Sequence, residues 1–417
     1  MTQNVRRPDT LDGTDRRAVL KASGVAGAGL FAGCLDNLGL GDDADDDTIT
    51  IGSLQPLSGP FTVWGNAHRA GLAFAVDEIN DDGGLLDREV EVVEADTESN
   101  ASEADTLFRR YVEDDGAVAI TGPVDSDVGV RTAQTAEDLE VPLVLHMAGS
   151  HRIHTKESRY TFRMGSLPAP MDLSPQADLI EENGYEVVGV LNADYEWGNT
   201  VAEQVDSFFP EGIDLTMELA AVDESDFAPF LREMDDDTEL MVATGHPPGQ
   251  NSIHSQFLEL GYSPEMTTGA GFPPAVIFDE LGAEAETFAH LHVVDVYDDA
   301  FQDVAERFAD DRGERMDTHE ALGYVAGTMI AEAVEAADST DPIDVADEIR
   351  DIQFDSLLAN PIQYNEWGEI DEVSLLLSTF EPEAPEYFPD GDFRLVEAFR
   401  SDPMSADIVE PLVEDER

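Results

Sequence analysis

The chain contains little positive charge and almost no cysteine. Of its 417 residues, 22 are Lys or Arg, 91 are Asp or Glu, and one is a cysteine, Cys34. A single cysteine excludes a disulfide within the chain and a metal site built from several thiolates. No stripe of basic residues occurs. We therefore expect no nucleic acid partner, because binding to a phosphate backbone depends on clustered Lys and Arg.

Short motifs of catalysis and phosphate binding are also missing. The chain has no GxxxxGK[ST] phosphate loop, no HExxH motif and no GxSxG nucleophile turn. His146, His151 and His154 gather in LHMAGSHRIH, but the nine histidines do not follow the spacing of metal ligands. A metal site there is the alternative to three solvated histidines. We expect that the protein is not an enzyme and uses neither a metal nor another cofactor.

The excess of acidic residues gives a formal net charge of −69, while 42% of the residues are hydrophobic. That hydrophobic content is enough for a large core. Lysine occurs only as Lys21 and Lys156, so Asp and Glu occupy surface positions where lysine is usually common. Such a surface is tolerable where salt screens the repulsion, since the Debye length is about 3 Å at molar ionic strength. We infer a protein of a hypersaline organism.

The basic residues that do occur near the N-terminus precede a short apolar run, in TDRRAVLKASGVAGAGLFAGC over residues 14–34. The run is shorter than the ~20 residues of a membrane-spanning helix, and a basic cluster before such a run is typical of an export signal. Arg16 and Arg17 resemble the twin-arginine signal. The ending FAGC resembles a lipobox, in which Cys34 becomes the lipidated N-terminus. The alternative is an ordinary buried cysteine.

These features predict a signal peptide over residues 1–33 and an acidic tether over residues 34–47. We expect an exported protein, held at the outer face of the cell membrane by a lipid on Cys34.

After the tether, segments with the pattern of strands alternate with segments with the pattern of helices, which predicts an α/β fold around mostly parallel sheets. The expected strands are Thr48–Leu54, Glu89–Ala95, Ala117–Thr121, Val141–His146, Glu186–Leu191, Ile213–Leu219 and Glu239–Thr244. The expected helices are 65–80, 102–114, 126–139, 198–209, 227–234, 251–260, 299–311, 318–337 and 342–351. The mature length favours two lobes. We expect residues 401–417 to be a poorly ordered acidic tail.

Several blocks of the chain resemble the branched-chain amino-acid-binding (Leu/Ile/Val-binding) family, the extracytoplasmic solute-binding proteins of ABC importers, here as a haloarchaeal-type lipoprotein. They are IGSLQPLSGPFTVWGNAHRAGLAFAVDEINDDGGLLDREVEVVEAD, AVAITGPVDSD, VPLVLHMAGS, RYTFRMGS, ADYEWGN and NPIQYNEWGEI. The resemblance implies two Rossmann-like lobes with three crossovers, the type I periplasmic-binding-protein fold. The N-terminal lobe would comprise 48–165 plus about 295–355, and the C-terminal lobe 166–294 plus about 356–400.

The resemblance also implies the walls of a ligand cleft. The PLSG turn with Ser58 and the aromatic Trp64 would form the first wall, with Trp64 against the apolar side of the ligand. A half-buried core aromatic is the alternative for Trp64. Trp197, in DYEWG, replaces a common tyrosine on the second lobe.

The same resemblance places polar ligand contacts in two loops. Ser126 would bind the carboxylate of the ligand, and the start of a helix there favours an anion. A plain N-cap serine is the alternative. Ala148, Gly149 and Ser150 would offer backbone groups and a hydroxyl to the carboxylate and ammonium groups.

One departure from the family leaves the ligand open. Amino-acid-binding members often carry a carboxylate within the segment that reads TTGAGF here, whereas this chain has three small residues that end at Gly271. The resemblance implies that Gly271 contacts the ligand. A buried ammonium without a counter-charge is costly. Asp125 is a candidate substitute. The alternatives are another acid, or a ligand that is an amide, a urea-like solute, or an aromatic or aliphatic acid.

Together these observations predict a lipid-anchored protein that captures a small organic solute between two lobes and delivers it to ABC permease subunits in the membrane. The alternatives are a receptor that presents its closed form to a membrane signalling partner, and a hydrolase that borrows the fold.

Overall fold

The computed structural model describes residues 48–244, 249–262 and 265–416. The expected signal over residues 1–33 and the tether over residues 34–47 lie outside the described residues, with Arg16, Arg17 and Cys34, and both stay predictions. Within the described part, no helix is long and apolar enough to cross a membrane.

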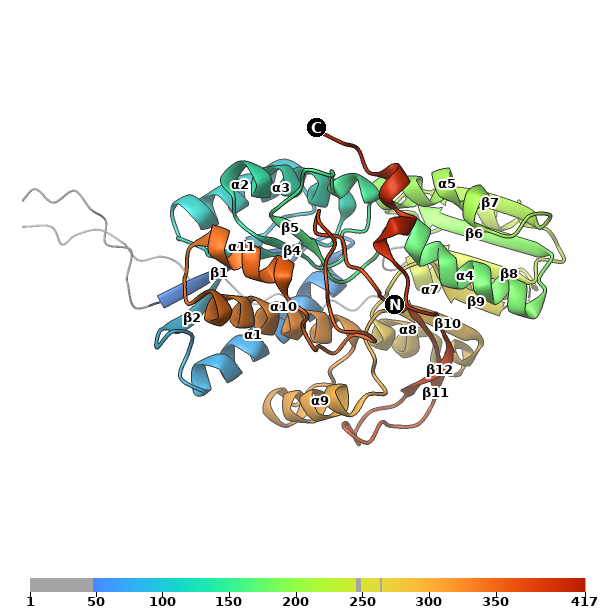
Figure 1. Cartoon of the computed structure of the whole chain (residues 1–417). Coiled ribbons are helices and arrows are strands. Elements are labelled where there is room, and N and C mark those ends of the chain that lie inside the picture. The colour runs from blue at the N-terminus through green and yellow to red at the C-terminus, as the bar shows by residue number, and fades with distance from the viewer. Residues whose placement is uncertain (1–47, 245–248, 263–264, 417) are drawn as a thin grey trace, which may run out of the picture. The chain divides into compact units, whose positions relative to one another are not determined.

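Five parallel strands form the first sheet, in the order β2-β1-β3-β4-β5 (Figure 1). They are β1 (Thr48–Gln55), β2 (Glu89–Asp96), β3 (Ala119–Thr121), β4 (Leu143–Leu145) and β5 (Thr161–Arg163). The first four are connected by α1 (Thr62–Asp81), α2 (Ala101–Glu113) and α3 (Ser126–Leu139). Every residue of β1 after Thr48 is buried, because helices cover both faces of a parallel sheet.

Seven strands form the second sheet, in the order β12-β11-β10-β9-β8-β6-β7. Its strands are β6 (Val187–Ala193), β7 (Asp214–Ala220), β8 (Leu240–Thr244), β9 (Glu265–Thr268), β10 (Phe288–His292), β11 (Leu376–Glu381) and β12 (Arg394–Arg400). The strands from β6 to β10 are parallel, and β11 and β12 pair in the antiparallel sense at one edge. The helices of this part are α4 (Ala169–Asn183), α5 (Glu196–Phe208), α6 (Ala228–Leu231), α7 (Gly249–Glu259) and α8 (Pro274–Leu281).

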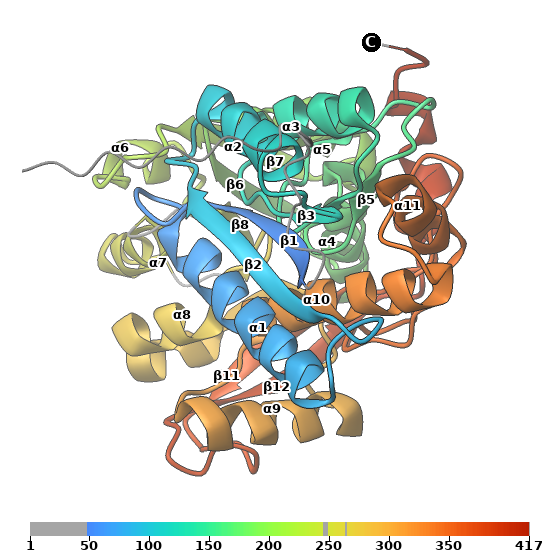
Figure 2. The same ribbon diagram turned by 90° about the vertical axis from the view of Figure 1, so that its left-hand side faces the viewer.

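The chain passes between the two sheets three times: after β5, after β10 and before β11. The second and third passages enclose α9 (Asp299–Arg312), α10 (Thr318–Ala337) and α11 (Pro342–Asp351). Helix α10 packs on α1 (Figure 2). A Cβ on Gly71 of α1 would lie 1.7 Å from the carbonyl oxygen of Glu320 in α10, so glycine permits this close approach.

We call the first sheet with α1–α3 and α9–α11 the first lobe, and the second sheet with α4–α8 the second lobe. This is the α/β architecture with three crossovers that the sequence analysis expects. We propose that the lobes meet at 165/166, about 294/295 and about 355/356, where the chain passes from one sheet to the other.

The expectation of a poorly ordered tail is wrong for residues 401–416. This segment contains two short turns, η3 (Ala406–Ile408) and η4 (Glu410–Leu412). The backbone of Met404 exchanges two hydrogen bonds with that of Val373, and Lys156 N–H donates to the carbonyl oxygen of Glu414. Val409 is fully buried. The apolar residues between the acidic ones hold the segment against the rest of the chain.

Candidate functional site

Trp64 and Gly271, two of the predicted ligand-binding residues, meet where the lobes join. Trp64 lies in the first turn of α1, and its indole Nε1 donates a hydrogen bond of 3.1 Å to the carbonyl oxygen of Gly271, which follows β9. The indole also meets Phe272 edge-on, with 4.9 Å between ring centroids. Trp64 is 2% exposed. It is therefore a buried residue whose polar atom links the first lobe to the second.

Trp197 lies at the same junction, in the first turn of α5. It fills space next to two glycines: a Cβ on Gly149 of the first lobe would lie 2.8 Å from its Cδ1 atom, and a Cβ on Gly269 would lie 3.5 Å from Cη2. A larger residue at position 149 would collide with the ring. Gly149 and Gly269 therefore leave the space in which Trp197 lies between the lobes.

Two aromatic residues that the sequence analysis missed continue this surface. Phe61 lies 6.0 Å from Trp64 and 5.7 Å from Tyr195, measured between ring centroids. Tyr195 in turn lies 6.4 Å from Trp197. The four rings form an aromatic cluster with members from both lobes.

Ser126 organises the loop that follows β4. Its Oγ accepts hydrogen bonds from the backbone N–H groups of Gly149 (3.0 Å) and Ser150 (3.1 Å). The N-cap of α3 is Asp125, whose Oδ1 accepts from the N–H of Val128 at 3.0 Å. The reading of Ser126 as the N-cap is therefore wrong. The hydroxyl hydrogen of Ser126 remains able to donate to an anion at the start of α3.

A buried ion pair supports the other side of that loop. The guanidinium group of Arg163 donates to the carbonyl oxygens of Ala148 and of Ser150, the latter at 3.0 Å. Its Nε lies 2.6 Å from Glu369 Oε1, and both side chains are at most 1% exposed. Burial alone would raise the pKa of Glu369, but Arg163 and His154 together hold it below the ordinary value. Ser126 and Arg163 therefore both hold the loop from Ala148 to Ser150 in place.

Charged residues form contacts between the lobes at the solvent-exposed edge of the junction. Ser150 Oγ donates to Glu196 Oε1 at 2.8 Å, and Arg152 Nη1 lies 3.0 Å from the same oxygen. Arg152 also binds Glu203 at 2.7 Å. Glu196 and Glu203 belong to α5, so these contacts join the first lobe to the second.

Two buried carboxyl groups face the junction, and each has an oxygen, Oδ2, without a hydrogen-bond partner among the described residues. Burial raises the pKa of Asp125 to about 7. Asp172, in the first turn of α4, is 3% exposed, and burial raises its pKa well above that of an exposed carboxyl group. Asp125 is predicted from the sequence and Asp172 is not, because acids are too numerous here for one to stand out.

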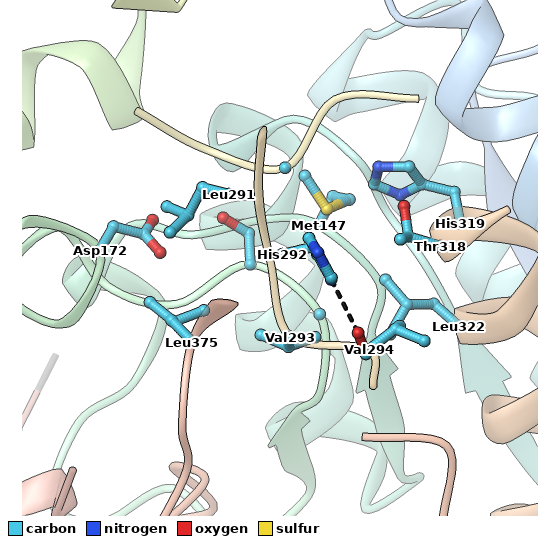
Figure 3. Close-up of a pocket in the computed structure, with 13 residues that line it drawn as sticks. Met147, Asp172, Leu291, His292, Val293, Val294, Thr318, His319, Leu322 and Leu375 are labelled. Atoms are coloured by element: carbon cyan, nitrogen blue, oxygen red, sulfur yellow. Dashed lines mark hydrogen bonds between the residues drawn. The ribbon is translucent and has the colours of Figure 1, made fainter. Parts of the chain in front are cut away.

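A cavity lies between the loops of the first lobe and the second lobe (Figure 3). Its walls are mostly apolar, including Met147, Leu291 and Leu322, and its polar lining comes from Ser166, Asp172, His292, Thr318 and His319. The volume of the cavity is about 20 Å³. This is room for about one water molecule. Gly271 also lines the cavity.

Ser58 is not part of this arrangement. It is exposed, and its hydroxyl interacts with Asp96 at the end of β2. Asp96 also accepts a hydrogen bond of 2.8 Å from the N–H of Leu57. We therefore assign Ser58 to the turn that follows β1 and not to the candidate site.

The histidines are buried and not solvated, contrary to the expectation for His146, His151 and His154. His146 is fully buried, stacks on His68 with ring centroids 4.1 Å apart, and contacts His319 through Nε2 and Nδ1 at 3.3 Å. Burial lowers the pKa of His68 and of His319 to about 3. His154 is buried next to Glu369. Within the described ranges, no group of three or more His, Cys, Asp or Glu side chains could hold a metal ion.

Comparison with known proteins identifies the family to which the chain is similar. The sequence model of the family described as periplasmic binding protein matches residues 48–373. A Leu/Ile/Val-binding protein homolog of Brucella suis is 24% identical over 310 residues, covering 69% of this chain and 76% of the relative. A chemotactic signal transduction system substrate-binding protein of Halobacterium salinarum is 40% identical over 91 residues, 21% of this chain and 22% of that one.

Among solved structures, the solute binding protein of an ABC transporter from Rhodopseudomonas palustris, in complex with 3,4-dihydroxybenzoic acid, superposes with a TM-score of 0.74. The two chains are 20% identical, and the match covers 86% of this chain and 99% of the other. The likeness extends over both lobes.

Proposed function

Because the chain belongs to the periplasmic binding protein family, we propose that it captures a small organic solute between its lobes and delivers it to an ABC permease. The observation that supports this most is the junction itself, where the Trp64 indole of the first lobe bonds to Gly271 beside a cavity lined from both lobes. Concave, mostly apolar sites with a few directed polar groups are typical of small-molecule binding. Unaltered release of the solute distinguishes this role from that of an enzyme.

The proposed ligand is a branched-chain amino acid or a related small solute, such as an amide, a urea-like solute, or an aromatic or aliphatic acid. The start of α3 with Ser126, and the loop from Ala148 to Ser150, would receive its anionic end. Two supports for this are the helix N-terminus, which favours negative charge, and the hydroxyl of Ser126, which can still donate. The aromatic cluster that includes Trp64 and Trp197 would cover its apolar part.

In the proposed mechanism, the lobes separate to admit the solute and close over it. The contacts of Glu196 with Ser150 and Arg152 join the lobes, and we expect them to break when the lobes separate. A bound solute stabilises the closed form by its extra contacts, and the permease recognises that form because both lobe surfaces are then in register.

We also propose that the protein is exported through the signal at Arg16 and Arg17 and anchored by a lipid on Cys34 to the outer face of the membrane. The acidic composition, with a net charge of −69, supports a hypersaline setting.

A thermal-shift screen of the full chain in molar KCl against amino acids, amides and small carboxylates tests the proposal, followed by calorimetric titration of each compound that stabilises it. Binding of one solute class at one site per chain is the expected result. An absence of any stabilising compound would contradict it.

A second role, solute sensing for a membrane signalling partner, is favoured by the similarity of one segment to the chemotactic protein of Halobacterium salinarum. Deletion of the gene separates the two roles. Loss of uptake of the cognate solute supports transport, while normal uptake with loss of the behavioural response supports sensing.

A further inference from the structure

We propose that the solute carries a hydroxyl group, apart from its carboxylate, that donates a hydrogen bond to Nε2 of His319 and accepts one from the hydroxyl of Thr318. This inference rests on the proposed function, because it assigns a chemical group of the solute to the same cavity.

The first observation is that the cavity wall holds two polar atoms for which the described chain offers no partner. Thr318 and His319 begin α10, each is 2% exposed, and both line the cavity. Thr318 Oγ1 and His319 Nε2 form no hydrogen bond within the described residues. Figure 3 shows both residues at the opposite end of the cavity wall from Asp172. Buried polar atoms are normally hydrogen-bonded, so a ligand is expected to supply these two bonds.

The second histidine of the cavity wall, His292, has both of its nitrogens bound within the chain. Its Nδ1 lies 2.7 Å from the carbonyl oxygen of Val294, the contact marked in Figure 3. Its Nε2 lies 2.6 Å from Ser378 Oγ. A solute in the cavity would therefore find its histidine partner in His319.

A series of hydrogen bonds determines which nitrogen of His319 carries the hydrogen. In the orientation that the structure gives the Gln55 amide, Oε1 faces His146 Nδ1 at 3.3 Å. An amide oxygen only accepts, so His146 Nδ1 is the donor. A neutral imidazole has one N–H group, so His146 Nε2 accepts from His319 Nδ1, also at 3.3 Å. Nε2 of His319 is therefore an unprotonated acceptor.

The surroundings of His319 favour a neutral donor on the solute. Burial lowers the pKa of His319 to about 3 and that of His146 well below the ordinary value, so both rings are uncharged. The described groups that act electrostatically on His319 are other buried histidines, His68 and His292. An ammonium group at Nε2 would therefore have no counter-charge, and a carboxylate would face a lone pair. A hydroxyl group can donate to Nε2 and also accept from Thr318.

Gly271 leaves space in front of this acceptor. A Cβ on Gly271 would lie 3.7 Å from His319 Nε2, and Gly271 itself lines the cavity. The Trp64 indole, which bonds to Gly271, meets the His319 ring edge-on with 6.5 Å between centroids. His319 Nε2 therefore lies beside the aromatic cluster. The hydroxyl that reaches it would belong to the apolar part of the solute and not to its anionic end.

The test compares sets of three probes that differ only in a hydroxyl, a hydrogen or a methoxy group at one position. The sets are L-tyrosine, L-phenylalanine and O-methyl-L-tyrosine; 4-hydroxybenzoate, benzoate and 4-methoxybenzoate; and L-threonine, L-2-aminobutyrate and O-methyl-L-threonine. Calorimetry measures the affinities of the full chain in molar KCl. We expect the hydroxyl compound of at least one set to bind at least about tenfold more tightly than its two partners.

Two variants assign that preference to residues. His319→Phe should remove it by weakening the hydroxyl compound about tenfold, and Thr318→Val should weaken the same compound about fivefold. His254→Phe is the matched control, because His254 is a buried histidine of α7 that does not line the cavity. This control should keep the preference of the parent chain.

Nitrogen-15 NMR of the parent chain with labelled histidines tests the acceptor without a ligand, and His319→Phe identifies the signal. We expect a protonated Nδ1 and an unprotonated Nε2 in His319. A protonated Nε2 would overturn the assignment.

Binding of solutes by the parent chain with no preference for a hydroxyl group, a methoxy compound that binds as tightly as its hydroxyl partner, or an unchanged preference in His319→Phe would also overturn it. The comparison of probes on the parent chain needs no variant, so a folding defect in His319→Phe does not weaken the test. A parent chain that binds no solute of any class contradicts the proposed function instead.

Discussion

The indole N–H of Trp64 and the carbonyl oxygen of Gly271, 207 residues apart in the chain, are joined by a hydrogen bond of 3.1 Å. Trp64 begins the first helix of the first lobe, and Gly271 follows a strand of the second lobe. The bond therefore joins the two lobes. It places Trp64 at the junction of the lobes.

Two replacements of Trp64 should weaken solute binding to different extents. Trp64→Phe keeps most of the apolar area and loses the N–H donor, so we expect affinity for the cognate solute to fall about fivefold, the value of one hydrogen bond near 1 kcal/mol. Trp64→Ala also loses the ring and should bind about tenfold more weakly, or worse. Calorimetric titration measures both. Equal affinity of the parent chain and Trp64→Ala would exclude the residue from the site.

Ser126→Ala should also weaken binding about tenfold, because the variant removes a donor to the anionic end of the solute and frees the N–H groups of Gly149 and Ser150. Ser102→Ala provides the control, since Ser102 is an exposed residue in the first turn of α2. The same titration compares the two variants. An equal change of affinity in Ser126→Ala and Ser102→Ala would show that Ser126 does not bind the solute.

The buried pair of Arg163 and Glu369 should contribute strongly to stability. Glu369→Gln leaves the guanidinium group buried without a counter-charge, so we expect the free energy of unfolding to fall by about 3 kcal/mol. Glu94→Gln breaks the more exposed pair with Arg69 and should cost about 1 kcal/mol or less. Urea unfolding in molar KCl measures both changes. Similar values would show that burial of the first pair has little energetic consequence.

Histidine burial predicts a pH dependence of stability. His68 has a pKa lowered to about 3 by burial, so between about pH 6 and 4 the unfolded chain binds a proton there that the folded chain does not. The histidine therefore lowers stability as the pH falls through this window. Asp125, whose pKa is raised to about 7, acts in the opposite direction, because its folded form binds the proton first.

The contribution of His68 is isolated by comparison of the parent chain with His68→Gln. The free energy of unfolding of the parent should fall more steeply with acid, by about 1.4 kcal/mol per pH unit in that window. His146 and His319 lie beside His68 and stay neutral in both proteins. Parallel pH profiles for the two proteins would contradict a buried neutral His68.

Much of the fold follows from local patterns in the sequence. The helices expected over 126–139, 318–337 and 342–351 end where the structure ends them. Helix α4 was missed because Pro168, Pro170 and Pro175 argue against a helix, although proline is acceptable in a first turn and the structure also accommodates Pro175 inside α4. Strand β10 was missed because its two histidines look polar but are buried by tertiary contacts. The expected helix over 227–234 shortens to α6, since the chain turns before the run of aspartates at 235–237.

The candidate site was predictable only in part, for physical reasons. The tryptophans and glycines of the site were predicted from the resemblance to the family, and the structure places Trp64, Trp197, Gly149 and Gly271 at the lobe junction. Asp172 differs from the other acids only by burial, which depends on the packing of both lobes. Composition and spacing carry no signal for that property.

The central claim is that two lobes hold a solute and release it chemically unchanged. Equilibrium dialysis of the full chain in molar KCl against a pool of amino acids, amides and small carboxylates, followed by mass spectrometry of the retained compounds, tests it most directly. We expect one solute, or a group of close analogues, to be retained at one molecule per chain with its mass unaltered. Retention of nothing from the pool, or recovery of a hydrolysed product, would contradict it.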